Sequence, residues 1–182
     1  MRCACLCVRA GPILGVDWKN DTIFATCSLD RQIFVHEVGK KQPLAKFSGH
    51  KVPPCKQLAR AHVCVSRQRL TPPQDEVNAI TWDPQGQLLA SCSDDHTAKI
   101  WSLEQETAVH DIRDHTREIY SIKWSPTGPG TSNANRPLLL ASASFDTTIR
   151  LWNPEVGRTV ATLSKHMYVP DELAAPLALA SG

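Results

Sequence analysis

The stretch LASCSDDHTAKIW, from Leu89 to Trp101, decides the fold, because the chain contains two further versions of it. One is FATCSLDRQIFVH at residues 24–36, and the other is LASASFDTTIRLW at residues 140–152. Each version has a small or apolar run, then Ser-x-Asp, then a second run that closes six residues after the Asp. Self-similarity at a fixed spacing indicates a repeat architecture.

The residues around the three versions also recur. A Trp ends the apolar alternation before each one, at Trp18, Trp82 and Trp124, and a His follows each Asp by twenty residues. The three Asp residues are 65 and 51 positions apart, and removing 23 and 9 inserted residues leaves 42 in both cases. A period of about 40–45 residues is typical of four-stranded WD-repeat blades.

Each repeat predicts four short strands. In the second repeat, alternating or small apolar runs predict strands at 77–82, 88–93, 97–101 and 107–112. The third repeat predicts strands at 119–124, 138–143, 147–152 and 159–163, with an inserted loop between residues 126 and 137. We therefore expect an all-β fold, in which about three four-stranded antiparallel blades form a partial, open β-propeller.

The recurring His, Ser, Asp and Trp residues allow a catalytic interpretation, as in a Ser-His-Asp hydrolase. However, the set recurs with the period of the fold, and the chain has no G-x-S-x-G motif, so a structural role is favoured. We assign no catalytic residue and expect a buried hydrogen-bond network instead. Its expected members are His50, Asp95, Trp101, His115, Asp146 and Trp152, with either Ser142 or Ser144.

Composition excludes several other classes. The chain has 182 residues, which predicts one domain, and a net charge of +2, which gives no basic field for nucleic acid. No apolar run has the ~18–20 residues of a membrane span. Seven cysteines, an odd number, favour a reducing compartment. The spacing of His50, Cys55, His62 and Cys64 fits no compact zinc pattern, and we expect neither metal nor cofactor.

The sequence resembles the transducin-beta-like WD-repeat proteins, also called F-box-like/WD-repeat proteins. The resemblance rests on EVNAI at 76–80, LASCSDD at 89–95, IKWSPTGPGT at 122–131 and LASASFD at 140–146. It covers about Ile13–His50 and Asp75–His166.

This resemblance implies a non-enzymatic nuclear scaffold that acts in transcriptional regulation. The implied partners are subunits of corepressor and histone deacetylase complexes, and histone tails; no sequence-specific nucleic-acid or membrane partner is expected. The family also recruits ubiquitin-conjugating machinery. A substrate-recognition fragment of a ubiquitin ligase therefore stays open as an alternative, and so does a non-functional variant.

Three segments fall outside the resemblance, at 1–12, 51–74 and 167–182. The blades are expected at 13–50, 75–115 and 116–166. Segment 51–74 contains five Lys or Arg residues, four Pro residues and no acid, and we expect a disordered insert. The family's N-terminal dimerisation motif and F-box-like segment are missing, so we expect a truncated or variant form. Its open blade faces favour self-association.

Partners are expected where the turns before each repeat Asp meet the starts of the first strands. The candidate partner-binding residues are Leu29, Glu76, Asp94, Glu118, Tyr120 and Phe145. An exposed aromatic pair such as Tyr120 and Phe145 would suit an interaction hot spot, and the carboxylates would favour a basic tail. Packing between blades stays open as an equally favoured alternative for Tyr120.

Overall fold

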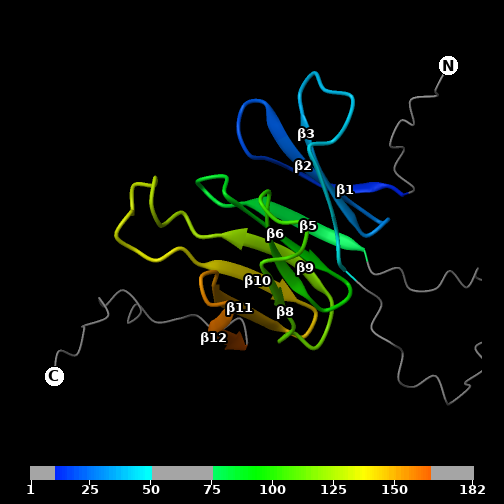
Figure 1. The fold of residues 1–182 in the computed structure, drawn as a ribbon. Helices are drawn as coiled ribbons and strands as arrows, with labels where there is room; N and C mark the ends of the chain where they lie inside the picture. Colours follow the sequence, from blue (N-terminus) through cyan, green and yellow to red (C-terminus); the bar gives the residue numbers. More distant parts are fainter. Residues whose placement is uncertain (1–10, 51–75, 165–182) are drawn as a thin grey trace, which may run out of the picture.

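The computed structural model describes residues 11–50 and 76–164. These residues form twelve strands and no helix, arranged as three four-stranded antiparallel sheets (Figure 1). The all-β fold and the three four-stranded blades predicted from the repeats are therefore confirmed. The insert at 51–74, the segment at 167–182 and His166 lie outside the described residues, so the expectations for them stay predictions.

Within each sheet, every strand pairs with the next strand in the chain. The first sheet contains β1 (Ile13–Trp18), β2 (Ile23–Ser28), β3 (Gln32–Glu37) and β4 (Ala45–Ser48). The second contains β5 (Val77–Trp82), β6 (Leu88–Ser93), β7 (Ala98–Ser102) and β8 (His110–Ile112). The third contains β9 (Ile119–Trp124), β10 (Leu140–Ser144), β11 (Thr148–Asn153) and β12 (Arg158–Ser164). The predicted strand bounds agree within two residues, except that β8 begins three residues later than expected.

The second and third strands of each sheet are joined by the same tight turn. The residue after the repeat Asp has a positive φ in all three turns, at Arg31 (64°), His96 (66°) and Thr147 (69°). The Asp carboxylate accepts the backbone N–H two residues further on, at 2.9–3.0 Å. This side-chain bond closes the turn and compensates for a backbone conformation that non-glycine residues seldom adopt. The repeat Asp is therefore a turn residue in every sheet.

The core lies between sheets, because the facing surfaces of neighbouring sheets are buried against each other. Strand β1 lies against β5, and β5 lies against β9, so the three sheets follow one another from blue through green to orange in Figure 1. The first apolar layer joins the first and second sheets and contains Ala25, Cys27, Ile33, Val35, Phe47, Val77, Ile80, Trp82, Leu89 and Trp101. The second layer joins the second and third sheets and contains Ala90, Cys92, Ala98, Ile100, Ile112, Ile119, Ile122, Leu140 and Trp152. Each blade thus depends on the next one for its burial.

Candidate functional site

The first polar network joins the end of the first sheet to the second sheet. His50 follows β4, and its Nδ1 lies 2.9 Å from Oδ2 of Asp95 in the β6–β7 turn. The other ring nitrogen, Nε2, lies 2.9 Å from Oγ of Ser91. The indole N–H of Trp101 donates to the same Ser91 oxygen at 2.8 Å. All four residues are buried, so this hydrogen-bond chain crosses the space between two sheets.

The second network repeats this geometry between the second and third sheets. His115 follows β8, and its ring nitrogens lie 2.7 Å from Oδ2 of Asp146 and 2.8 Å from Oγ of Ser142. The indole N–H of Trp152 donates to Ser142 Oγ at 2.8 Å. Ser144 instead donates to the carbonyl oxygen of Arg117 at 3.1 Å. Of the two serines that the sequence left open, Ser142 therefore bonds to the His and the Trp.

Two threonines belong to these networks and were missed from the sequence. The Thr97 hydroxyl donates to Asp95 at 2.6 Å, and the Thr148 hydroxyl donates to Asp146 at 2.6 Å. Both lie two residues after their Asp, whereas the first sheet has Gln32 in that place. The recurrence of a hydroxyl at this position is the signal that could have identified them.

Burial and hydrogen bonds shift the pKa values of the Asp and His side chains in the two networks. Burial raises the pKa of Asp95, but hydrogen bonds from His50 and Thr97 outweigh it and bring the pKa to about 2. Burial lowers the pKa of His115, which the neighbouring Asp146 opposes. Burial raises the pKa of Asp146, but bonds from Thr148 and His115 overcome this and bring it well below its usual range. The carboxylates are therefore ionised acceptors near neutral pH.

The His-Asp-Ser order resembles a hydrolase triad, but its serine oxygens face away from solvent. Ser91 is 0% exposed and Ser142 is 1% exposed, and each oxygen already bonds to a His and a Trp. A nucleophile must reach its substrate, with a base free to take its proton. This arrangement suits a role in joining sheets.

The first sheet carries aromatic contacts on the corresponding face. Thr26 and His36 occupy the places of the network Ser and Trp, as strand register shows. His36 stacks on Phe24 with ring centroids 5.4 Å apart, and Phe24 lies 5.1 Å from Trp18.

The three candidates that precede the repeat Asp residues occupy equivalent places. Leu29, Asp94 and Phe145 each donate a backbone N–H to a carbonyl just before the first strand of their sheet, at 2.9–3.1 Å. The accepting residues are Pro12, Glu76 and Glu118. The edge of the molecule formed by these turns and first-strand starts is called the turn edge below.

A β-bulge at the start of each first strand places one further side chain at this edge. Strand pairing skips one residue at the same position in β1, β5 and β9, and the skipped residues are Leu14, Asn78 and Tyr120. A bulge redirects the side chain of its extra residue. Tyr120 is 50% exposed and lies 5.1 Å from Phe145, which is 57% exposed. The structure thus brings together the aromatic pair that the sequence predicted.

Asn78 connects the second and third sheets at the turn edge, and the sequence interpretation missed it. Its amide donates to Asp94 Oδ1 at 2.7 Å and to the carbonyl oxygen of Ile119 at 2.9 Å. The bulge shifts the phase of the apolar pattern, because Val77 and Ile80 are three positions apart and are nevertheless buried in the same layer.

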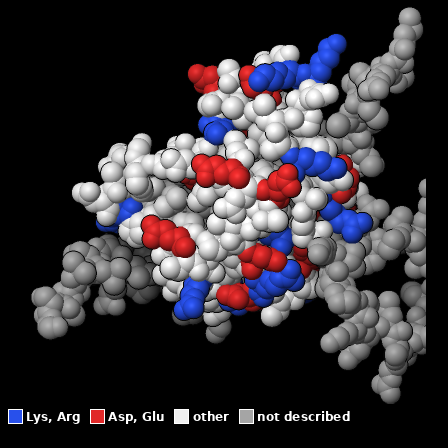
Figure 2. Space-filling model, in the orientation of Figure 1, with Lys and Arg blue, Asp and Glu red and all other residues white. Residues whose placement is uncertain are grey.

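Glu118 lies two residues before Tyr120, and Glu76 and Asp94 occupy the equivalent turn of the second sheet. Burial raises the pKa of Glu76, and the nearby Asp94 raises it further. Glu118 lies 3.6 Å from Arg117, which is 63% exposed. Elsewhere the charges alternate in sign, and Figure 2 shows Lys and Arg interspersed with Asp and Glu over the visible face. The turn edge combines apolar rings with negative charge, which suits a basic, extended partner.

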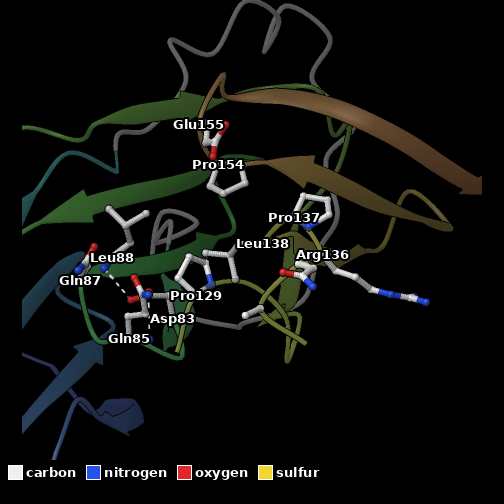
Figure 3. Close-up of a pocket in the computed structure, with 12 residues that line it drawn as sticks. Asp83, Gln85, Gln87, Leu88, Pro129, Arg136, Pro137, Leu138, Pro154 and Glu155 are labelled. Carbon is white, nitrogen blue, oxygen red and sulfur yellow. Dashed lines mark hydrogen bonds between the residues drawn. The ribbon is translucent and has the colours of Figure 1, made fainter. Parts of the chain in front are cut away.

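A shallow pocket lies at the opposite edge, between the β5–β6 turn, the loop after β9 and the β11–β12 turn. Its volume is about 390 Å³, and Pro129, Pro137 and Pro154 are among its lining residues (Figure 3). The Asp83 carboxylate accepts the backbone N–H groups of Leu88 at 2.7 Å and Gln85 at 3.2 Å. This carboxylate therefore closes a turn.

No group of His, Cys, Asp or Glu side chains in the described ranges, 11–50 and 76–164, is arranged to hold a metal ion. The same ranges contain no helix that could cross a bilayer.

Comparison with known proteins agrees with the fold. The family "WD domain, G-beta repeat" matches residues 63–102 and 106–153. The second match takes in β8 together with β9–β11, so the sequence repeat is offset from the sheet by one strand. This offset explains why each network His precedes the sheet that carries its Asp. The chain is a WD-repeat protein, a class whose members are typically non-enzymatic scaffolds.

The relatives define the family more narrowly. The chain is 48% identical over 158 residues to the WD40 repeat-containing protein HOS15 of Arabidopsis thaliana. It is 50% identical to the F-box-like/WD repeat-containing protein TBL1X of Mus musculus, and 49% identical to TBL1Y of Homo sapiens, again over 158 residues. Each alignment covers 87% of this chain and 22–26% of the relative. The chain belongs to the transducin-beta-like WD-repeat family, and it spans about a quarter of the length of these relatives.

Proposed function

We propose that this chain is a non-enzymatic, protein-binding scaffold of corepressor type that acts in transcriptional regulation in the nucleus. Membership of the transducin-beta-like family supports this proposal, because the family resemblance implies partners in corepressor and histone deacetylase complexes. The two buried polar networks serve the fold, and no chemical step is assigned to them.

The turn edge is the proposed binding surface, and the exposed Tyr120–Phe145 pair is the observation that carries the proposal. Aromatic side chains are common interaction hot spots, and their faces attract Lys and Arg. Glu76, Asp94 and Glu118 supply carboxylates at the same turn edge. The partner that fits is therefore a basic, extended segment such as a histone tail.

A peptide-binding titration tests this proposal. A fluorescent Lys- and Arg-rich histone-tail peptide is titrated with the full chain, and anisotropy reports the dissociation constant. We expect Tyr120→Ala or Phe145→Ala to weaken binding by about tenfold or more, as hot-spot truncation does. Glu118→Lys is expected to weaken binding most at low salt, because screening reduces the contribution of charge.

Matched controls lie at the opposite edge. Val156 is 58% exposed and Glu155 is exposed, and both belong to the β11–β12 turn. Val156→Ala and Glu155→Lys are expected to bind the peptide like the unchanged chain. Equal affinity for all the variants would refute the assignment of the turn edge, and equal recovery of corepressor subunits from nuclear extract would do the same.

A further inference from the structure

Asn78 is the extra residue of the β5 bulge, and its side chain reaches from the second sheet to the third. The amide nitrogen Nδ2 donates to Oδ1 of Asp94 at 2.7 Å and to the carbonyl oxygen of Ile119 at 2.9 Å. Asp94 lies in the β6–β7 turn, and Ile119 is the first residue of β9. The two amide hydrogens of Asn78 therefore join a turn of the second sheet to the first strand of the third.

The segment of β9 that Asn78 binds is also the segment that carries the aromatic pair. Ile119 directly precedes Tyr120, which is the extra residue of the β9 bulge. The Phe145 N–H donates to the carbonyl oxygen of Glu118 at 2.9 Å, so the residue before Ile119 is bonded to the other member of the pair. Residues 118–120 thus link Asn78 to both rings.

The start of β9 benefits from a fixed point of this kind. A bulge leaves its extra residue outside the regular pairing of the two strands, so the ladder alone does not fix Tyr120. Tyr120 is 50% exposed, and packing therefore restrains this ring less than it restrains a buried one. A hydrogen bond from the second sheet to the adjoining carbonyl restrains the backbone instead. Groups that are held in place before binding lose less entropy when a partner arrives.

We infer that Asn78 is a positioning residue of the turn edge, which fixes the Tyr120–Phe145 pair relative to the Asp94 turn. One partner segment can then contact the second and third sheets together. The inference rests on the proposed function, since it concerns the same binding surface. Because both amide hydrogens of Asn78 already have acceptors within the chain, its effect on binding passes through the rings and not through a contact of its own.

A binding cycle of Asn78→Ala and Tyr120→Ala in the full chain tests the inference, with the fluorescent histone-tail peptide as the probe. Asn78→Ala is expected to weaken binding about fivefold, and Tyr120→Ala about tenfold or more. The double variant is expected to bind about as weakly as Tyr120→Ala alone, because a residue that acts through the ring has nothing left to position. Circular dichroism checks that each variant folds.

A second variant separates position from charge. Asn78→Asp keeps the shape of the side chain, removes both donors and adds a negative charge. It is expected to weaken binding at least as much as Asn78→Ala, whereas a direct contact with the basic peptide would make binding tighter. Asn78→Asp also replaces Asn78→Ala in the cycle if the alanine variant does not fold.

Thr159→Val is the matched control. The Thr159 hydroxyl donates to Oδ2 of Asp114 at 2.6 Å, so this variant also removes a hydrogen bond between β12 and the segment that follows β8. Strand β12 lies at the other side of the third sheet from β9. Thr159→Val is therefore expected to bind the peptide like the unchanged chain.

A fluorine spectrum reports the position of the Tyr120 ring without any peptide. The chain has two Tyr residues, so Tyr168→Phe leaves Tyr120 as the one that takes up 3-fluorotyrosine. In this background, Asn78→Ala is expected to shift and broaden the Tyr120 resonance, and Thr159→Val is expected to leave it unchanged.

Four results would overturn the inference and leave the proposed function standing. They are unchanged peptide binding by Asn78→Ala while Tyr120→Ala weakens it, losses for the two variants that multiply in the double variant, tighter binding by Asn78→Asp, and an unchanged fluorine resonance in Asn78→Ala. Equal affinity of Tyr120→Ala, Phe145→Ala and the unchanged chain would instead refute the proposed function, and the inference with it.

Discussion

The first sheet and the two that follow it share strand order, register and turn geometry, yet they differ in their polar interior. In the second and third sheets a His from the preceding sheet bonds to the repeat Asp and to a Ser that also accepts an indole N–H. In the first sheet the equivalent Asp30 closes its turn through Gln32, and aromatic rings fill the face. The three described blades share the apolar alternation and the Asp turn, and the network occurs where one described sheet follows another.

Replacing the repeat Asp is expected to give the largest difference in unfolding free energy between the second sheet and the first. Asp95→Ala is expected to cost about 3–5 kcal/mol of unfolding free energy, because buried donors on His50 and Thr97 lose their acceptor. Asp30→Ala removes a turn bond at a half-buried position and is expected to cost about 1 kcal/mol. Urea denaturation of both variants measures the difference, and equal losses would contradict the comparison.

Within the third sheet, the network serine Ser142 and its neighbour Ser144 are expected to differ in how much each contributes to the unfolding free energy. Ser142→Ala removes the partner of both His115 and Trp152 and is expected to cost about 2–4 kcal/mol. Ser144→Ala removes the bond to the Arg117 carbonyl and the acceptor for the Asp146 N–H, and is expected to cost about 1–2 kcal/mol. A larger loss for Ser144→Ala in the same denaturation assay would show that the network is assigned to the wrong serine.

Acid should weaken the networks in two stages. The pKa of His115 is lowered in the folded protein, so its contribution is present above its ordinary value of 6.5 and declines as pH falls below it. The pKa of Asp95 falls from 3.8 to about 2, so its contribution is present above about pH 4 and is lost on going down to pH 2. The loss of the Asp95 contribution lowers the unfolding free energy by on the order of 2 kcal/mol.

Unfolding free energies measured from pH 8 to pH 2 check these stages. His115→Gln is expected to remove the decline that begins near pH 6.5, and Asp95→Asn is expected to reduce the fall between pH 4 and pH 2. An unchanged pH profile in either variant would show that the group does not titrate as described.

The smallest expected effect concerns the residue two positions after the Asp. Thr148→Val keeps the shape of the side chain and removes the 2.6 Å bond to Asp146, at an expected cost of about 1 kcal/mol. Gln32→Ala, at the same place in the first sheet, is expected to stay within about 0.5 kcal/mol of the unchanged chain. Thermal unfolding of the two variants tests this, and a greater loss for Gln32→Ala would count against the comparison.

The recurrence of Asp and Trp at fixed spacing was enough to predict the blades, because the strand period and the Asp turn are local properties. The aromatic pair of Tyr120 and Phe145 was also predictable, since both follow from their places in the repeat. The choice between Ser142 and Ser144 was not, because both side chains lie on the same face of β10 and only the position of each along the strand decides which one meets His115 and Trp152. Asn78 was missed because the bulge that places its side chain is a property of two paired strands.

A double-mutant cycle between His115 and Asp146 tests most directly whether the polar networks join consecutive blades. Unfolding free energies are measured for the unchanged chain, His115→Ala, Asp146→Ala and the double variant. Because the two side chains lie 2.7 Å apart and belong to different sheets, we predict a coupling energy of about 1–3 kcal/mol. Losses that add to within about 0.3 kcal/mol would contradict the account, because independent sites behave in that way.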